Sequence, residues 1–220
     1  MGASMKILCV SASNSRKKND DSVSYNVLKR VKSGIEQKSD NEVELLSLSE
    51  YNIKPCNLCG ECSKTKSCVY DIDFNEVLQQ IKQVDRILFV VPHYSPIPSK
   101  LIAIFEKINE ITYATWLSDS NFVSPVNGKA FTVIGHGGMT ETPDVLAYYQ
   151  ETIVKPVSRT LISLGMIQIK PEYGDSCSDV FGLLNDNCLK SLGGKVFPDI
   201  FIDWERVEAR IEPLIELLIR

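Results

Sequence analysis

KILCVSASNS, residues 6–15, joins an apolar run to a segment made almost entirely of small polar residues. An apolar run without polar alternation is typical of a strand that is covered by helices on both faces. RILFVV, residues 86–91, and AFTVIG, residues 130–135, have the same character. Strands of this kind occur in parallel sheets, so the three runs predict the centre of a parallel sheet.

Further apolar runs and helical patterns extend this prediction along the chain. The five candidate strands are residues 6–10, 43–48, 86–91, 129–135 and 166–170. The predicted helices are residues 24–37, 74–83, 99–111, 143–164 and 204–219. Thr142 and Pro143 predict the start of the fourth helix, and Gly165 predicts its end. Because proline lacks a backbone N–H, Pro156 and Pro213 are expected to kink or divide the last two helices.

Strand–helix units in sequence predict an α/β fold, a three-layer sandwich around a five-stranded parallel sheet. The expected strand order is 2-1-3-4-5, the flavodoxin-like order. We expect a single domain over residues 5–220, with residues 1–4 as an added expression remnant. Residues 112–128 and 174–200 show no regular pattern and are predicted to be long loops. Ligands of such folds bind at the carboxyl ends of the strands, which makes the loops after strands one, three and four the candidate site.

The charge of the chain argues against nucleic acid as a partner. Its 220 residues carry a formal net charge of −4, and the one basic cluster is residues 16–18. Nucleic-acid phosphates require a larger basic surface. No apolar run approaches the roughly 20 residues that span a bilayer, and the first residues lack the pattern of a secretory signal. We therefore expect a cytoplasmic protein that binds neither nucleic acid nor membranes.

The loop after the first strand is rich in hydroxyl and amide groups. Its candidate ligand-binding residues are Ser11, Ser13, Asn14, Ser15, Arg16 and Ser24. Because the free N–H groups of a helix N-terminus attract phosphate, these residues predict a monophosphate site. The loop lacks the glycine-rich dinucleotide motif and the Gly-Lys-Ser/Thr motif, which disfavours NAD or ATP bound in those ways. The alternative is a polar surface loop whose serines cap the helix.

Two further loops should meet the first at the same edge of the sheet. VPHYSPIPSK, residues 91–100, is stiffened by prolines and could hold its rings ready for a flat heterocycle, or it is only a rigid turn. GHGGM, residues 135–139, lets backbone approach a ligand, or it is only a glycine turn. The candidate contacts are Pro92, His93, Tyr94, Ser95, Pro96, Ile97, Gly135, His136, Gly137 and Gly138. We expect both histidines to pack against or hydrogen-bond the ligand, and no motif for hydrolysis or other acid–base catalysis is found.

CNLCGECSKTKSC, residues 56–68, contains four of the seven cysteines. An odd number of cysteines without a secretory signal argues against a disulfide framework. The spacing C-x2-C-x2-C-x5-C lets four thiolates surround one centre, which suits either a [4Fe–4S] cluster or tetrahedral zinc, and free redox thiols are a further alternative. The candidate ligands are Cys56, Cys59, Cys62 and Cys68. Cys9 is expected in the core, and Cys177 and Cys188 are assigned no role.

Together these motifs resemble the iron–sulfur flavoproteins, within the larger family of NAD(P)H-dependent FMN reductases of flavodoxin-like fold. The resemblance covers roughly residues 5–170 and includes the acidic YDID at residues 70–73. It implies FMN, with its phosphate on the first loop and its isoalloxazine ring against the other two. It also implies a [4Fe–4S] cluster on the four cysteines of the loop at residues 55–73. The implied assembly is a homodimer or homotetramer in which cluster and flavin meet near an interface.

The function that this resemblance implies is that of an FMN-dependent oxidoreductase. Electrons would pass from NAD(P)H or a ferredoxin-like donor to an acceptor through the cluster, and donor and acceptor would be small molecules or proteins. Flavins suit this role because they are stable in one-electron and two-electron reduced forms. One alternative is a cluster-free NAD(P)H-dependent FMN quinone or azo reductase. The other is a non-enzymatic zinc-binding interaction module.

Overall fold

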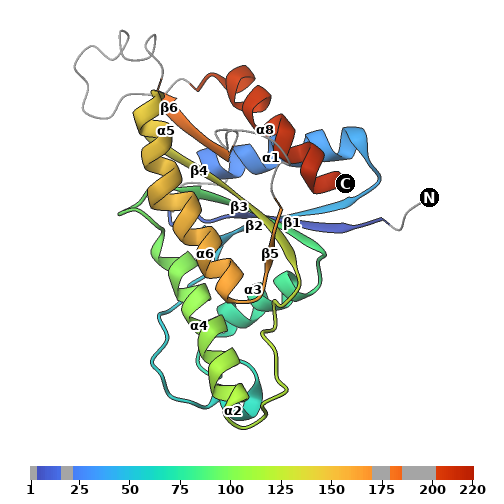
Figure 1. Ribbon diagram of the computed structural model, residues 1–220, viewed down its shortest axis with the longest axis vertical. Helices are drawn as coiled ribbons and strands as arrows, with labels where there is room; N and C mark the ends of the chain where they lie inside the picture. Colours follow the sequence, from blue (N-terminus) through green and yellow to red (C-terminus); the bar gives the residue numbers. More distant parts are fainter. Residues whose placement is uncertain (1–3, 16–21, 170–178, 185–201) are drawn as a thin grey trace.

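The computed structural model describes residues 4–15, 22–169, 179–184 and 202–220 (Figure 1). Its strands are β1 (Lys6–Ser11), β2 (Glu42–Ser47), β3 (Arg86–Pro92), β4 (Ala130–Thr140), β5 (Ile167–Gln168) and β6 (Val180–Leu184). Its α-helices are α1 (Val23–Lys38), α2 (Cys62–Thr65), α3 (Ile72–Lys82), α4 (Ser99–Trp116), α5 (Pro143–Tyr149), α6 (Lys155–Ser163) and α8 (Trp204–Ile219). A 3-10 turn, η2 (Leu48–Glu50), follows β2, and a π-helical turn, η3 (Gln150–Val154), joins α5 to α6. No helix in these described ranges is long and apolar enough to span a membrane.

The sheet has the predicted order, β2-β1-β3-β4-β5, and all of its pairings are parallel. Strand β1 lies inside the sheet, with Leu8 opposite Glu44 of β2 and Ile87 of β3. Every residue of β1 after Lys6 is buried. A strand that is buried on both faces must be covered by a helical layer on each side, which confirms the predicted three-layer α/β sandwich.

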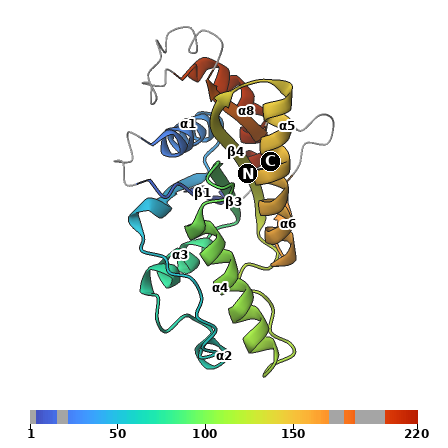
Figure 2. The same ribbon diagram turned by 90° about the vertical axis from the view of Figure 1, so that its left-hand side faces the viewer.

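Helices cover both faces of the sheet (Figures 1 and 2). The alternation of side chains along β1 assigns the helices to each face. Leu8 and Val10 face the core that includes side chains of α3, α4 and α6. Ile7 and Cys9 face the core that includes side chains of α1 and α8, so Cys9 is a core residue as expected. Burial raises the pKa of the Cys9 thiol to about 12, and this thiol therefore stays protonated. The short helix α2 lies at one end of the molecule, beside the last turns of α4.

The edge of the sheet differs from the sequence prediction. Strand β4 continues to Thr140, so GHGGM at residues 135–139 belongs to a strand and not to a loop. Strand β5 pairs only with the start of β4, while β6 pairs with residues 135–140. In the part of the chain that the structure describes, the sheet is therefore six-stranded, and residues 180–184 form a strand within a segment predicted to be a loop. Two short strands share one long neighbour here, a tertiary pairing that local periodicity does not reveal.

The helices also correct the prediction in detail. Helix α4 extends to Trp116, into the segment predicted to be a loop. Thr142 caps α5 by accepting a hydrogen bond from Val145 N, as predicted. Pro156 does divide the predicted helix of residues 143–164, because the π-helical turn immediately precedes α6, in whose first turn the proline lies. Gly165 has φ +92° at the end of α6, a left-handed conformation that favours glycine. Helix α8 continues through Pro213.

Candidate functional site

The carboxyl end of β1 and the start of α1 form the first wall of a cavity. Ser13 Oγ accepts a hydrogen bond from Ser15 N at 3.2 Å and lies 3.0 Å from Tyr94 Oη, with which it shares a hydrogen bond. Asn14 Nδ2 donates to Ser99 Oγ at the start of α4. These contacts hold the loop after β1 against the loop after β3. Arg16, the remaining predicted contact of this segment, lies outside the described residues.

Helix α1 begins one residue earlier than predicted. Its N-cap is Ser22, whose hydroxyl accepts a hydrogen bond from Tyr25 N. Ser24 is buried, and its Oγ lies 2.8 Å from His136 Nε2 on β4. Ser22 was not among the predicted site residues, although a serine just before an apolar helical pattern is an N-cap signal. The first turn of α1 therefore faces the cavity with hydroxyl groups and backbone N–H groups.

The end of β3 and the loop after it form the second wall. Pro92 is the last residue of β3 and pairs with His136 of β4, and His93 N donates to His136 O at 2.7 Å. Tyr94 N donates to Pro96 O at 2.6 Å, and Ser95 between them has a positive φ of 53°. The chain thus turns tightly after His93. Ile97 packs against the core beneath the loop.

These walls enclose a cavity of about 220 Å³ at the carboxyl edge of the sheet. The predicted site residues that line it are Ser13, Ser15, Ser24, Pro92, His93, Tyr94, His136, Gly137 and Gly138. Ser22, Val23 and Leu183 complete the lining. Ser11, Asn14, Ser95, Pro96, Ile97 and Gly135 were predicted as contacts and are not among its lining residues. The structure therefore brings three separate segments to one cavity, as the sequence predicted.

His136 forms the buried base of this cavity. Its ring stacks on Phe181 of β6 with the centroids 5.2 Å apart, and burial lowers the pKa of His136 to about 3. The imidazole is therefore neutral near pH 7. Within the described part of the chain, His136 Nδ1, Ser11 Oγ and Asn14 Oδ1 are buried and have no hydrogen-bond partner. Of these three residues only His136 lines the cavity. Buried polar atoms are almost always paired in native proteins, so a polar ligand in the cavity would satisfy His136 Nδ1.

Aromatic side chains of α5, which the sequence analysis did not predict, line a neighbouring cavity of about 460 Å³. His93 and Gly138 line both cavities, so the two adjoin. Tyr148 Oη lies 3.0 Å from His93 Nε2, and Tyr149 Oη accepts a hydrogen bond from Met139 N. The signal available in the sequence was the tyrosine pair at the end of an amphipathic helix, which also fits ordinary core packing.

The four motif cysteines line a separate cavity of about 230 Å³. Its other lining residues are Lys54, Pro55, Asn57, Gly60, Val69, Tyr70, Asp71, Lys107, Glu110 and Ile111. Cys62 is buried and Cys59 is exposed. Burial raises the pKa of the Cys62 thiol, and the nearby Glu110 carboxylate raises it further. All four thiols are free. Their sulfurs do not already form a metal-binding group, because no cluster of three or more candidate ligands is present in the described ranges.

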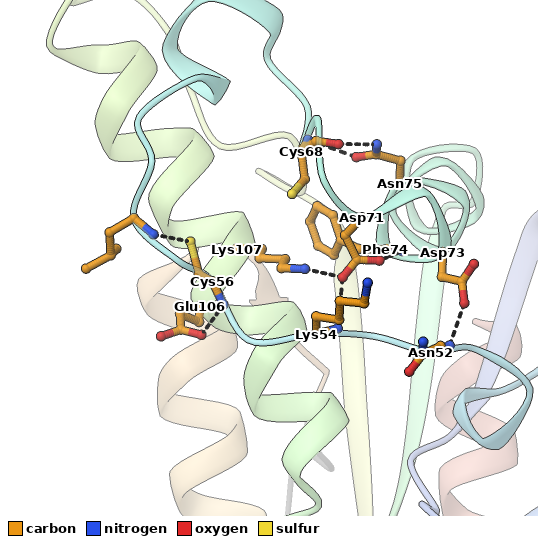
Figure 3. Close-up of polar contacts among 11 residues, drawn as sticks. Asn52, Lys54, Cys56, Cys68, Asp71, Asp73, Phe74, Asn75, Glu106 and Lys107 are labelled. Atoms are coloured by element: carbon orange, nitrogen blue, oxygen red, sulfur yellow. Dashed lines mark hydrogen bonds and ion pairs between the residues drawn. The ribbon is translucent and has the colours of Figure 1, made fainter.

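Side chains of α3 and α4 hold the cysteine backbone in place (Figure 3). Cys68 N donates to Asn75 Oδ1 at 3.0 Å, and Asn75 Nδ2 donates to Cys68 O at 2.7 Å. Cys56 N donates to Glu106 Oε2 at 2.9 Å. Thr115 Oγ1 donates to Cys62 O at 3.4 Å. Three of the four candidate ligands are therefore anchored to helices. The cysteines were predicted from the sequence, whereas Asn75, Glu106 and Thr115, which hold their backbone, were not.

Comparisons with known proteins identify the family of the chain. The family model described as NADPH-dependent FMN reductase matches residues 5–172. The iron–sulfur flavoprotein of Methanosarcina thermophila is 30% identical over 67 residues, which cover 30% of this chain and 35% of that protein. The chain thus aligns with about a third of the length of that relative.

Two solved structures share the fold. The NAD(P)H:quinone oxidoreductase from Methanothermobacter marburgensis has a TM-score of 0.60 at 17% identity, and the alignment covers 99% of this chain and 98% of that chain. An azoreductase from Bacillus anthracis str. Sterne has a TM-score of 0.57 at 17% identity, covering 98% of this chain and 99% of its own. Identities this low show the fold alone. The family model, in contrast, spans most of the sequence, including the four motif cysteines and the three predicted segments of the flavin cavity, and this protein therefore belongs to the NADPH-dependent FMN reductase family.

Proposed function

We propose that the protein is an FMN-dependent oxidoreductase that transfers electrons between a reduced nicotinamide or ferredoxin-like donor and an acceptor through a [4Fe–4S] centre. The observation that carries the flavin part is the convergence of three segments, the end of β1 with the start of α1, the end of β3 and the end of β4, on one cavity. This is the place where sheets of this topology bind ligands. Family membership supports FMN as the flavin.

The start of α1 is the phosphate end of the proposed site. Ser13, Ser15, Ser22 and Ser24 line the cavity there, and the N-terminus of this 16-residue helix adds backbone N–H groups. Helix N-termini favour anions through these donors and through the helix dipole. No described lysine or arginine lines the cavity, so hydrogen bonds and the helix dipole would provide the binding energy. This arrangement suits the single phosphate of FMN.

The ring end of the proposed site is the part of the cavity that His93, Tyr94, Gly137 and Gly138 line. A Cβ on Gly138 would meet no atom within 4 Å, so the backbone there faces open space and leaves room for a flat ring. The neutral His136 at the base can donate or accept one hydrogen bond at Nδ1. The chain would bind and orient the flavin and exclude water from one side of it, with no side chain required as acid or base.

The cysteine cavity is the proposed site of the metal centre. Cys56, Cys59, Cys62 and Cys68 supply a four-sulfur donor set, which suits a [4Fe–4S] cluster. When bound, FMN would supply two-electron and one-electron chemistry, and the cluster would supply a one-electron centre. Hydrogen bonds from α3 and α4 hold the backbone of three of these cysteines in place, which supports a preorganised metal site. The match to an iron–sulfur flavoprotein includes only part of the chain and supports the same proposal.

The two sites are separate within one chain. They share no lining residue among those described, and α4 reaches from Ser99 near the first loop to Lys107 at the cysteine cavity. Eight residues of α-helix span about 12 Å at 1.5 Å per residue. We propose a homodimer or homotetramer in which the centre of one subunit approaches the flavin of another, and light scattering of the purified protein would show whether it is an oligomer.

A second candidate is a cluster-free FMN quinone or azo reductase. The exposed Cys59 and the absence of a preassembled metal group in the described ranges favour this candidate. Anaerobic purification followed by a visible spectrum and by iron, zinc and flavin analysis separates the candidates. Flavin bands with a broad iron–sulfur absorption and about four irons per chain support the proposed function. Flavin bands without iron support the second candidate, and colourless protein with bound zinc would identify a zinc-binding module instead.

A further inference from the structure

A buried ion pair lies in the wall of the cysteine cavity. Asp71 is the N-cap of α3 and Lys107 is on α4, and the two side chains form a salt bridge in which each is only 3% exposed. Both residues line the same cavity as the four cysteines. Figure 3 shows the Lys107 side chain reaching from α4 to the Asp71 carboxylate, with Cys56 and Cys68 beside it. Lysine and aspartate are seldom fully buried, so this pair requires an explanation.

Asp71 joins the two ends of the cysteine loop. Its carboxylate accepts hydrogen bonds from Lys54 N at 2.9 Å, just before the motif, and from Phe74 N at 2.9 Å, just after it. Lys107 then fixes this closure to α4, and its ammonium group also lies over the Phe74 ring, 5.2 Å from the centroid. Asp71 thus connects the residues just before and just after the cysteine motif to α3 and α4.

The charges of the pair balance each other next to the cavity. Burial alone would raise the pKa of Asp71, but the hydrogen bonds from Lys107, Lys54 N and Phe74 N outweigh it and keep the carboxylate ionised. Charges in a poorly hydrated site are weakly screened, so each would act strongly on a metal–thiolate centre nearby. Acting together, they add a net charge of zero. Substitution of only one partner would leave one uncompensated charge beside the centre.

We propose that Asp71 and Lys107 are a positioning pair that holds the cysteine loop in its metal-binding conformation and keeps the net charge beside the metal centre at zero. This inference rests on the proposed function, because it requires a metal–thiolate centre. Neither residue need bind the metal. Residues that support metal ligands in this way typically contribute about tenfold to hundredfold to metal retention.

The decisive measurement is the midpoint potential of the iron centre, loaded anaerobically with Fe²⁺ and sulfide in the full chain. Lys107→Met leaves the negative charge of Asp71, so the added electron is less favoured and the potential shifts downwards. Asp71→Asn leaves the positive charge of Lys107, and the potential shifts upwards. The double variant is neutral, and its potential lies between those of the single variants. A purely structural role does not predict shifts of opposite sign.

Lys64→Met is the matched control, because it removes a lysine of the same loop whose side chain is 79% exposed. Water screens this charge, so the control keeps the wild-type potential. FMN affinity stays at the wild-type value in every variant, since the flavin cavity has a separate lining.

Each single variant leaves a lone buried charge, which destabilises the fold, whereas neutral replacement of both partners is often tolerated. The double variant Asp71→Asn/Lys107→Met therefore provides a second test. We expect an iron chelator to remove its iron at least about ten times faster than wild-type iron.

The outcomes separate the inference from the proposed function. A wild-type chain that holds FMN but no iron after loading overturns the metal centre, and this inference with it. If wild-type iron is present, opposite potential shifts support the inference. Equal potentials, shifts of the same sign, or a wild-type rate of iron loss in the double variant overturn the inference and leave the metal centre standing.

Discussion

Gly137 and Tyr149 are in contact at the edge of the flavin cavity. A Cβ built on Gly137 would lie 2.2 Å from Tyr149 Oη, which is closer than real side chains approach. Tyr149 is almost fully buried and accepts a hydrogen bond from Met139 N, so it has little freedom to move. The neighbouring Gly138 has open space at the same position. The two adjacent glycines therefore have different roles, one in packing and one in the room left for a ligand.

Gly137→Ala should destabilise the protein by about 1–3 kcal/mol, because the new methyl group overpacks against Tyr149. Gly138→Ala is the matched control for folding and should leave the unfolding free energy within about 0.5 kcal/mol of wild type. It should still weaken FMN binding, because its methyl group enters the cavity. Urea denaturation without flavin and FMN titration measure the two effects. Equal stability losses in both variants would contradict the packing argument.

His136 should make stability depend on pH. Burial lowers its pKa to about 3 in the folded protein, well below the ordinary value of about 6.5. Between these values the unfolded chain binds a proton that the folded chain does not, so the unfolding free energy falls as the pH drops from about 6.5 towards 3. The limiting slope is about 1.4 kcal/mol per pH unit.

The measurement compares denaturation of wild type and His136→Gln at several pH values. The carboxylates that also titrate in acid are common to both proteins, so the difference between the curves isolates His136. The wild type should lose more stability than the variant between about pH 6.5 and 4. Parallel curves would show that His136 gains a proton as readily in the folded state as in the unfolded state.

At the scale of elements, the phosphate end depends on the β1–α1 connection. Ser13 and Ser24 come from opposite ends of it, and their hydroxyls are held by Tyr94 and His136. The two described ends of the connection are thus held by the loop after β3 and by β4. A helix start that is supported in this way can present hydroxyl groups and N–H groups to an anion with little further ordering.

Replacing Ser13 and Ser24 together with Ala should lower FMN affinity by at least about tenfold, which corresponds to roughly 1.4 kcal/mol of lost phosphate hydrogen bonding. Ser33→Ala, an exposed position on the same helix, serves as the control and should bind FMN like wild type. Fluorescence titration of the apoprotein with FMN and with riboflavin measures the effect. The loss should be larger for FMN, since riboflavin lacks the phosphate, and an equal loss for both ligands would place the phosphate elsewhere.

At the scale of the whole molecule, the flavin cavity and the cysteine cavity are built from different parts of the fold. One lies at the carboxyl edge of the sheet, and the other lies between the loop after β2 and the later turns of α4. This separation means that a defect in one site need not reach the other.

Cys59→Ala should therefore remove most of the iron and leave FMN affinity unchanged. Cys59 is exposed, so the substitution should have little effect on packing. Iron and flavin analysis of the anaerobic protein measures both cofactors, and Ser63→Ala in the same motif is the control. Parallel loss of iron and flavin would show that the two sites depend on each other.

The fold could be predicted to a large extent because its main signals are local. The apolar runs predicted the strands, and the structure confirms the strand order. Thr142 and Gly165 predicted the two ends of a helical segment, and the structure confirms the Thr142 cap and the left-handed Gly165. The prediction was wrong where pairing is non-local. Residues 180–184 form a strand by pairing with the end of β4, which β5 leaves unpaired.

The candidate site shows the same division. Amino-acid types and spacing were enough to predict three of the segments that line the flavin cavity, though not Leu183 of β6, and to select four cysteines that share another cavity. The tertiary structure alone brought Tyr148 to His93, Ser24 to His136, and Lys107 to Asp71, over separations of 55, 112 and 36 residues. Periodicity and turn chemistry act between near neighbours, whereas a buried hydrogen bond or ion pair forms between groups that only the packed layers bring together.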